Sequence, residues 1–523
     1  MSKEIIKEKL ARPIIYTSKR YYIAITIVMI PILLAIFAYS IQLILGLGVT
    51  GLSTTIFWGM YISSFVFFIG ISHAGTLISA ILRITKAEWR KPITRMAEAI
   101  TVFALILAVA QVIIFDLGRP DRILHAIIFG RLQSPMVWDL FSITTYFIGS
   151  AVFLYTAMVP DFALFLNYEK LPRWKARMYR VFSLNWRGTE EQYERLSKAI
   201  KVMAASIIPI MVTVHTVVSW VFAMSIKPGW HSTVFGPYFV TGAIYSGIGA
   251  VIIVAWLYRK IFQSEEYIKY EHFAYLGWLL FSLDLALIYM TANHIVTDYY
   301  GGKVEDVALI NSLMFGEWAP IFWFYIIINI VIPLIILPIV LLYKKSWVIN
   351  GTFLASILVN VGMYIERYYI VASTLSITLL PYPIARYTPT WVELSILIGS
   401  LSLFVLFYLI FIKIFPPISV WEVEELDTIK SSNIGFNPYK ASRVTPLASS
   451  IPIWLLMVVI SAYFVLLYII SRAMISPVNT QEGFIAFNQA FVIGIGSLVT
   501  IALTCGWIAI GYTIYQLYKI SKV

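Results

Sequence analysis

Long runs of apolar residues, separated by short polar segments, follow one another along most of the chain. A helix needs about 20 predominantly apolar residues to cross the hydrocarbon core of a bilayer. Twelve runs reach that length, near residues 22–44, 56–82, 96–116, 136–159, 200–225, 237–258, 273–293, 319–343, 348–369, 391–412, 452–471 and 486–518. The pattern predicts an all-α integral membrane protein with about twelve transmembrane helices.

The distribution of basic residues orients these predicted spans. With the N-terminus placed in the cytosol, 31 of the 39 Lys and Arg residues fall in cytosolic segments, and none lies deep in a span. Cytosolic loops of membrane proteins carry an excess of positive charge. We therefore expect both termini in the cytosol and a multi-pass protein of the plasma membrane. The net charge of +12 then reflects orientation and contact with lipid, and no nucleic acid partner is expected.

Two longer cytosolic segments divide the predicted spans into groups of four, six and two. We expect a basic cytosolic N-terminus over residues 1–21, a membrane domain over 22–415, a cytosolic linker over 416–450 and a two-helix extension over 451–523. The chain has a single cysteine, Cys505. Disulfides and cysteine-ligated iron–sulfur clusters within the chain are therefore excluded.

Five ionisable residues lie within the predicted spans or at their ends, where a charge is costly and often marks a functional path. They are His73, Glu98, Asp116, His215 and Asp284. Glu98 and Asp116 are 18 residues apart, about five helical turns, so they share one face of their helix near its two ends. Because histidine titrates near physiological pH, the set suits a proton relay. Any one of them could instead hydrogen-bond a neighbouring helix and hold the helices together.

Two predicted outer loops, "FDLGRPDRILHAIIFGRLQSPMVWDLF" and "IKPGWHSTVFGPYF", combine aromatic and charged residues with Gly-Pro turns. Arg119, Asp121 and Arg122 lie in one such turn and predict a docking surface for a partner subunit. Asp139 follows an aromatic residue at the start of the fourth span, where a carboxylate could take protons from a hydroquinone. The tryptophans of these loops also fit an interfacial aromatic belt.

Longer motifs resemble the NrfD-type membrane subunits of polysulfide reductase and look most like the membrane subunits of alternative complex III. They are "GISHAGTLISAILRI", "WRKPITRMAEAITVFA", "LGRP", "SPMVWDLFSITTYF", "WRGTE", "PGWHSTVFGPYFVTGAIYSG", "ILVNVGMYIER" and "YTPTWVELSILIGSLSLF", spread over roughly residues 55–412 in the order of the family. The resemblance implies two four-helix bundles, formed by spans two to five and six to nine, with flanking helices. It also implies that the chain binds quinone or quinol without a haem or metal of its own.

The resemblance further implies electron exchange with a ferredoxin-like iron–sulfur subunit on the outer face. Further catalytic (molybdopterin-type) or cytochrome subunits, and a second NrfD-like membrane subunit, fit the same kind of complex. In polysulfide reductase, a histidine in the outer half of the helix corresponding to the second span contributes to the quinone pocket. That half reads "FWGMYISSFVFF" here and lacks a histidine. The expected quinone-binding residues are therefore Trp58, Tyr61 and Ser64, with Asp139 and His231. The last two spans do not resemble the family.

Two other functions fit a chain with twelve spans. A secondary transporter often divides six plus six around a central loop, whereas the long loops here follow the fourth and tenth spans. A haem b membrane anchor needs facing histidine pairs, and only His73 and His215 lie well inside spans. The favoured prediction is a quinone-handling subunit of a respiratory oxidoreductase that also translocates protons. It has no catalytic residue of its own and acts only with its redox partners.

Overall fold

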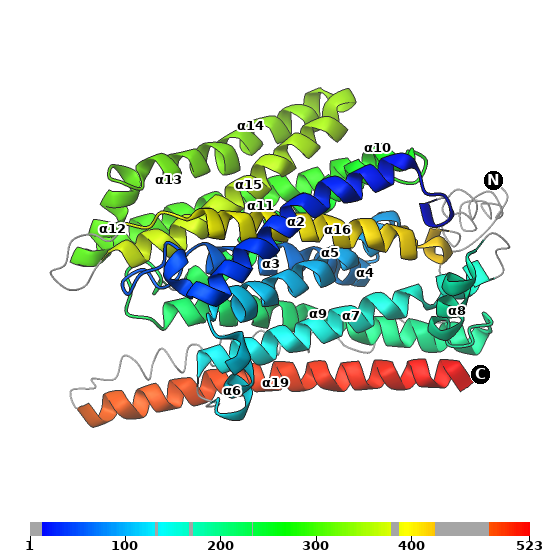
Figure 1. Cartoon of the computed structure of the whole chain (residues 1–523), viewed down its shortest axis with the longest axis horizontal. Helices are drawn as coiled ribbons and strands as arrows, with labels where there is room; N and C mark the ends of the chain where they lie inside the picture. Colours follow the sequence, from blue (N-terminus) through cyan, green and yellow to red (C-terminus); the bar gives the residue numbers. More distant parts are fainter. Residues whose placement is uncertain are drawn as a thin grey trace.

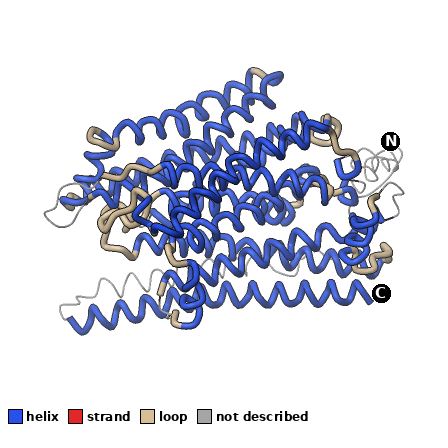
Figure 2. The backbone as a smooth tube through the Cα atoms, viewed as in Figure 1, coloured by secondary structure: helices blue, strands red, loops and turns tan. Residues whose placement is uncertain are grey.

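The computed structural model describes residues 13–130, 134–166, 171–232, 234–377, 386–423 and 481–522. Every regular element in these ranges is a helix (Figure 1, Figure 2). Ten helices within the described residues are long and apolar enough to cross a membrane. The prediction of an integral membrane protein built from helices is therefore confirmed.

The ten helices correspond one to one with the first ten predicted spans. Their bounds are Lys19–Leu45 (α2), Met60–Ile84 (α3, η2 and α4), Glu88–Asp116 (η3, α5 and η4), Pro135–Leu166 (α7), Glu190–Ala223 (α9), Phe235–Phe262 (α10), Tyr270–Gly301 (α11), Ala319–Tyr343 (α13, η6, α14 and η7), Val348–Ser376 (α15) and Trp391–Ile414 (α16). A further helix, α19 (Gln481–Lys522), contains the twelfth predicted span. The eleventh, 452–471, lies outside the described residues.

The long helices run side by side between two ends of the molecule (Figure 1). The start of α2 and the end of α19 lie at the same end, on the right of Figure 1, which we call the terminal end. The short surface helix α8 (Arg173–Phe182) also lies there, whereas α12 (Val304–Met314) lies at the opposite end. Helices α3, α7, α10 and α16 therefore begin at the opposite end, and α5, α9, α11 and α15 begin at the terminal end.

Helix α3 (Met60–Gly75) is the centre of the packing, because every one of its residues is buried. It packs against α5, α10 and α15. Small residues allow this close approach: a Cβ on Gly75 would collide with Thr101 of α5, and a Cβ on Gly247 of α10 would lie 2.9 Å from the backbone nitrogen of Ala74. Around this centre, α2 pairs with α16, and α19 lies along α9 and α7.

The chain after α16 folds back into the helix ends at the terminal end. Residues 416–423, which we call the cap segment, are buried apart from the half-buried residue 421. Asp161 of α7 pairs with Arg95 of α5 and accepts the backbone N–H groups of Val420 at 3.2 Å and Trp421 at 3.1 Å. Glu422 accepts a hydrogen bond from Arg83 at 2.8 Å. The expected linker over 416–450 thus begins with packed residues, and its part beyond residue 423 lies outside the described residues.

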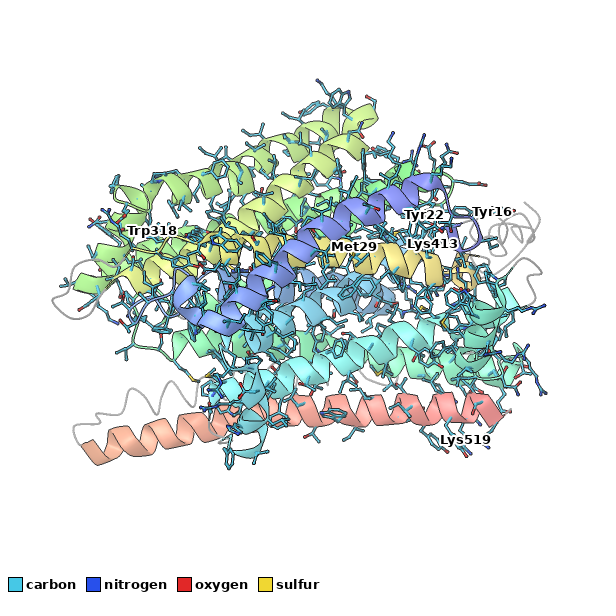
Figure 3. All side chains as sticks on the ribbon, viewed as in Figure 1. Tyr16, Tyr22, Met29, Trp318, Lys413 and Lys519 are labelled. Carbon is cyan, nitrogen blue, oxygen red and sulfur yellow. The ribbon has the colours of Figure 1, made fainter. Side chains whose placement is uncertain are left out.

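Just before the cap segment, Lys413 fixes the residues that precede α2. Its ammonium donates to the carbonyl oxygens of Pro13 at 2.7 Å and Tyr16 at 2.5 Å, close to where Figure 3 labels Tyr16 and Lys413. Lys175 of α8 donates to the carbonyl oxygens of Ile14 and Lys413, both at 2.7 Å. The terminal end is therefore held together by charge-assisted hydrogen bonds as well as by apolar packing.

Candidate functional site

His73 of α3 and His215 of α9 face each other in the protein interior. Their ring centroids lie 4.6 Å apart with the planes at 73°, and both side chains are fully buried. Nδ1 of His73 lies 2.9 Å from the carbonyl oxygen of Ile69, which can only accept, so this nitrogen carries a proton. The other nitrogen of His73 and both nitrogens of His215 have no hydrogen-bond partner among the described residues. Two touching imidazoles with unpartnered nitrogens can take up and pass on a proton.

Hydroxyl groups surround the backbone next to this histidine pair. Tyr146 of α7 and Thr101 of α5 both donate to the carbonyl oxygen of Ser72, at 3.0 and 2.6 Å. Thr101 Oγ1 also accepts the N–H of Gly75 at 2.8 Å. The π-helix η2 (Thr76–Ile81) begins here, and such wide turns often occur at functional sites. Three helices therefore meet at His73 through polar groups.

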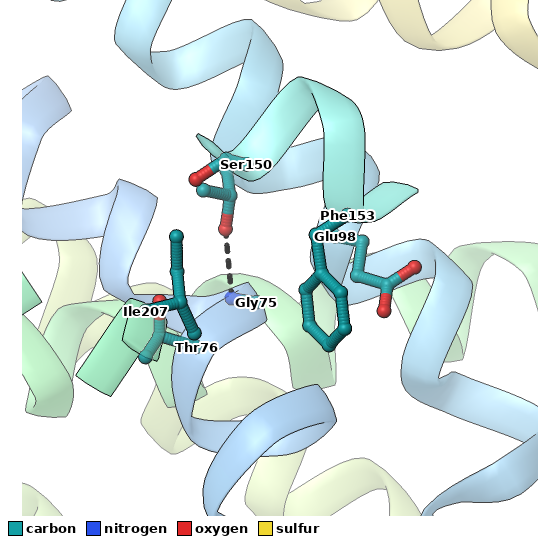
Figure 4. A pocket seen from close by; sticks show the side chains of 7 residues that line it. Gly75, Thr76, Glu98, Ser150, Phe153 and Ile207 are labelled. Atoms are coloured by element: carbon teal, nitrogen blue, oxygen red, sulfur yellow. Dashed lines mark hydrogen bonds between the residues drawn. The ribbon is translucent and has the colours of Figure 1, made fainter. Parts of the chain in front are cut away.

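Glu98 of α5 lies in a small pocket beside this network, shown in Figure 4. The pocket is lined by Gly75, Thr76, Glu98, Thr101, Ser150, Phe153 and Ile207. It offers about 10 Å³ to the centre of a water molecule, close to the space that one water needs. Both carboxylate oxygens of Glu98 and the hydroxyl of Ser150 lack a partner among the described residues. Glu98 therefore shares this pocket with Thr101 and with Gly75 and Thr76, which follow His73 on α3.

The other two residues of the predicted relay lie apart from this group. Asp116 ends the π-helix η4 (Gln111–Asp116) at the far end of the same span as Glu98, and its buried Oδ1 has no partner within the described residues. Asp284 of α11 is fully buried, and neither of its oxygens has a well-oriented hydrogen-bond partner among the described residues. Tyr245 of α10 interacts with it.

Two charged residues that the sequence analysis did not single out lie in the interior of α15. Glu366 and Arg367 are buried and form an ion pair with Oε2 and Nη1 2.8 Å apart. The guanidinium of Arg367 lies 4.4 Å above the ring of Phe239 in α10, and that ring lies 5.9 Å from His215. The expectation that no basic residue lies deep in a span is therefore wrong. The sequence "IER" (residues 365–367) within a long apolar run was the available signal for a buried charged pair. The predicted span ended two residues later, so the pair was placed near the end of the helix.

The expected quinone-binding residues fall into separate surroundings at the opposite end. Tyr61 is buried and donates to Oε1 of Gln42 in α2 at 2.5 Å, while the amide of Gln42 donates to the carbonyl oxygen of Phe115 at 2.7 Å. Trp58, three residues before Tyr61, packs on Phe222 at 5.3 Å. Tyr61 therefore faces α2 and α16, and Trp58 faces the end of α9.

The remaining members of that set are more dispersed. Ser64 donates to the carbonyl oxygen of Met60 at 2.7 Å and lies 3.2 Å from the hydroxyl of Tyr364. Asp139 of α7 has a buried Oδ1 without a partner in the described part of the chain. His231 lies at the surface, with Nε2 3.1 Å from Asp306. Among the described residues, no hydrogen bond or ring contact joins Asp139 or His231 to Tyr61.

Arg119 and Asp121, expected to form a docking surface with Arg122, bind each other. Their side chains form two hydrogen bonds, at 3.0 and 2.9 Å, and both are largely exposed. The hydrogen bonds from Arg119 lower the pKa of Asp121 below its usual range. The turn therefore presents an exposed ion pair together with the neighbouring Arg122.

A haem between the two histidines does not fit this arrangement, because their rings are in direct contact and leave no room for an iron atom. The described residues also contain no group of three or more His, Cys, Asp or Glu side chains placed to hold a metal ion.

Comparison of the sequence with known protein families gives the family of the chain. The sequence model described as "Polysulphide reductase, NrfD" matches residues 48–378, which include α3 to α15. The chain belongs to the NrfD family. The resemblance seen in the sequence motifs is therefore confirmed, and all residues of the histidine pair, the Glu98 pocket and the Glu366–Arg367 pair lie within the NrfD match.

Three relatives place this NrfD chain among membrane subunits of redox complexes. A Halobacterium salinarum protein, named as a membrane subunit of a dimethyl sulfoxide reductase, is 25% identical, over 70% of this chain and 84% of the relative. The Hdr-like menaquinol oxidoreductase integral membrane subunit of Archaeoglobus fulgidus is 24% identical, over 78% and 96%. A selenate reductase subunit of Mesobacillus selenatarsenatis is 23% identical, over 76% and 94%. The NrfD chain is thus similar to membrane subunits of multi-subunit reductases.

Proposed function

We propose that this NrfD chain is the membrane subunit through which a respiratory oxidoreductase exchanges electrons and protons with quinone, and that it moves protons across the membrane. The observation that carries the proposal is the contact between His73 and His215, next to Glu98, in the interior of a chain that belongs to the NrfD family. Buried ionisable groups without partners are costly in a membrane and are kept where they do chemistry. The relative from Archaeoglobus fulgidus, named for menaquinol, supports quinone as the substrate.

The proposed orientation puts the terminal end in the cytosol of a cell bounded by a plasma membrane. The excess of Lys and Arg in the segments at that end supports it. In this orientation α3, α5, α7 and α9 form one four-helix bundle, and α10, α11, α13–α14 and α15 form the second. The packing of α3 on α5 and of α7 on α9, and that of α10 on α11 and α15, supports this division, with α3 also packed on α10 between the two bundles.

The proposed quinone site lies near the outer ends of these helices. Tyr61 would supply a hydroxyl, with Trp58 just before α3 and Ser64 one turn further along it. Asp139 and His231 would join them from α7 and from the loop before α10. The carboxylate of Asp139 would take up a proton as the hydroquinone is oxidised. Its buried and unpartnered Oδ1 supports this role.

The proposed proton path runs from Glu98 near the cytosol to the histidine pair and on to the quinone site. His73, with its proton on Nδ1, can accept a second proton on Nε2. Asp116 and Asp284, which lie apart from this group, would serve at the outer end and in the second bundle. An iron–sulfur subunit would dock on the outer turn of Arg119, Asp121 and Arg122, with the further redox subunits beyond it.

Proteoliposomes that contain the purified complex test the proposal. We expect quinol turnover to move protons, reported by a pH dye. His73→Gln should abolish this movement in an assembled complex, whereas the exposed His125→Gln should not. Asp139→Asn should lower turnover at least about tenfold, which corresponds to a barrier of about 1.4 kcal/mol. A wild-type complex that turns over quinol without moving protons would refute the relay, and unchanged turnover in Asp139→Asn would remove Asp139 from the quinone site.

A further inference from the structure

The Glu366–Arg367 pair occupies a position that the proposed relay does not use. Glu366 lies 18 residues after the start of α15 and 10 residues before its end, so it is roughly 27 and 15 Å from the two ends of the helix. The side chains are at most 2% exposed. In many proteins, two buried charges lose more free energy by leaving water than they gain from their mutual attraction. A purely structural role would be served as well by apolar side chains.

The pair is also poorly satisfied by hydrogen bonds. Although Arg367 Nη1 is close to Glu366 Oε2, neither carboxylate oxygen of Glu366 nor Nη1 of Arg367 makes a hydrogen bond of acceptable geometry within the described residues. The rest of the guanidinium rests on Phe239 and against Gly242, where a Cβ would lie 2.7 Å from Nη2. Polar groups that are left available in this way can accept another partner, such as a proton or a water molecule.

On one side, the pair reaches the histidines. Arg367 lies 4.4 Å from the ring of Phe239, Phe239 lies 5.9 Å from His215, and His215 lies 4.6 Å from His73. A charge on the guanidinium therefore acts on both imidazoles across a single apolar ring. The low polarity of that ring leaves the electrostatic interaction largely unscreened.

On the other side, a cluster of tyrosines leads towards Asp284. Glu366 interacts with Tyr238, whose hydroxyl lies 3.5 Å from that of Tyr325. Tyr245, which donates to the carbonyl oxygen of Asn329 at 3.0 Å, interacts with both Tyr325 and Asp284. The hydroxyls of Tyr238 and Tyr325 can each accept one hydrogen bond while donating another, and the hydroxyl of Tyr245 can do so when it turns away from Asn329. Asp284, which lies apart from the histidines, is therefore connected to them by way of the Glu366–Arg367 pair.

We propose that Glu366 is a proton-carrying residue that links the histidine pair to Asp284, and that Arg367 couples the two sites by its charge. This inference rests on the proposed relay and adds a lateral branch to it. A proton that arrives at Glu366 binds one carboxylate oxygen, and no other bond is formed or broken. Because Arg367 stays protonated, the pair then changes from neutral to a net charge of +1. That charge opposes a second proton on His215, so Glu366 and the histidines hold a proton alternately.

The assembled complex in proteoliposomes tests this link through three variants. Glu366→Gln keeps the size of the side chain but cannot carry a proton. We expect it to lower the number of protons moved per quinol to the level of His73→Gln. Arg367→Lys keeps the charge and should retain proton movement, whereas Arg367→Gln should lose it. Glu305→Gln, at an exposed position of α12, is the matched control and should behave like the wild type.

Infrared difference spectra give a readout that a structural role would not change. Addition of quinol to the oxidised complex should produce a carboxylic C=O band that is lost in Glu366→Gln and kept in Glu305→Gln. If Glu366→Gln does not assemble, Glu366→Asp should shift the same band, and an unshifted band overturns the inference. Unchanged coupling and an unchanged spectrum in Glu366→Gln, with coupling lost in His73→Gln, would refute the link alone. Absence of proton movement in the wild type would refute the proposed relay itself.

Discussion

Removal of the negative charge of Asp161 tests how the cap segment is held. Asp161→Asn keeps the shape of the side chain and an oxygen that can accept the N–H of Val420 or Trp421. It removes the partner of Arg95, which is 1% exposed. Breaking a buried ion pair from one side costs about 3–5 kcal/mol. Because Arg95 also donates to the carbonyl oxygens of Pro416 and Ala157, at 3.2 and 2.9 Å, we expect the lower end of that range, about 3 kcal/mol.

Reversible unfolding of the purified chain in mixed detergent micelles measures this loss. The chain has 16 tryptophans, so the fluorescence of the cap segment is the difference between each chain and the same chain with Trp421→Phe. The indole N–H of Trp421 donates to the carbonyl oxygen of Ala157 at 3.0 Å. A loss of about 3 kcal/mol raises the unfolding equilibrium constant roughly 100-fold. Glu191→Gln is the matched control, because its exposed pair with Arg195 contributes only about 0–1 kcal/mol.

A second variant separates charge from shape. Arg95→Met combined with Asp161→Asn leaves no unpaired charge, so the double variant should be more stable than Asp161→Asn alone. The reasoning is refuted if Asp161→Asn loses no more stability than Glu191→Gln. It is also refuted if the double variant is the least stable, since the cost would then come from lost packing of Arg95.

Three further outcomes are expected. Burial acts to raise the pKa of Glu422, but the charges of Arg83 and Arg90 outweigh it and lower the pKa below its usual value. Glu422→Gln should therefore be less stable than wild type near pH 7, and the difference should be lost as the pH falls below about 4. A difference in stability that is independent of pH would contradict the ion pairing. Tyr61→Phe removes the hydrogen bond to Gln42 and should cost about 1–3 kcal/mol of stability. If Tyr61 also contacts the quinone head group, titration of this variant should show weaker quinone binding. Unchanged binding would leave Tyr61 with a structural role only. Arg119→Glu with Arg122→Glu should release the iron–sulfur subunit from a folded membrane chain in co-purification, and full retention would argue against docking at this turn.

The helices could be predicted from the sequence because burial in a membrane leaves a simple signal. Ten of the predicted spans match helices of the structure, since each run of about 20 apolar residues has few other ways to satisfy its backbone in lipid. The contact between His73 and His215 could not be predicted, because it depends on how α3 and α9 are rotated about their axes. Small residues such as Gly75, which lies against Thr101 of α5, permit the close packing of α3, and their effect appears only when the neighbouring helices are in place.

Charged pairs were the main features that reasoning from the sequence missed. Arg367 is adjacent to its partner, but it lies two residues before the predicted end of the span at residue 369, whereas the helix continues to Ser376. Arg95 and Glu422 lie far from their partners along the chain, so no local pattern joins them. The distance of Asp139 from Tyr61 in the packing was likewise hidden, because similar depth in a membrane does not imply contact.

The buried carboxylates of the described residues fall into two groups, those with hydrogen-bond partners and those without. Within the part that matches the NrfD family, Glu98, Asp284 and Glu366 are buried carboxylates without a satisfactory hydrogen bond to the described residues. Other buried carboxylates are engaged: Asp161 binds Arg95, Glu393 binds Tyr387 and the N–H of Gly51, and Glu422 binds Arg83. Since an unpaired buried acid destabilises a fold, selection for stability alone would have paired or removed the first group. The paired acids therefore hold helix ends together, whereas the three without a satisfactory partner are the ones to which the proposed function assigns protons.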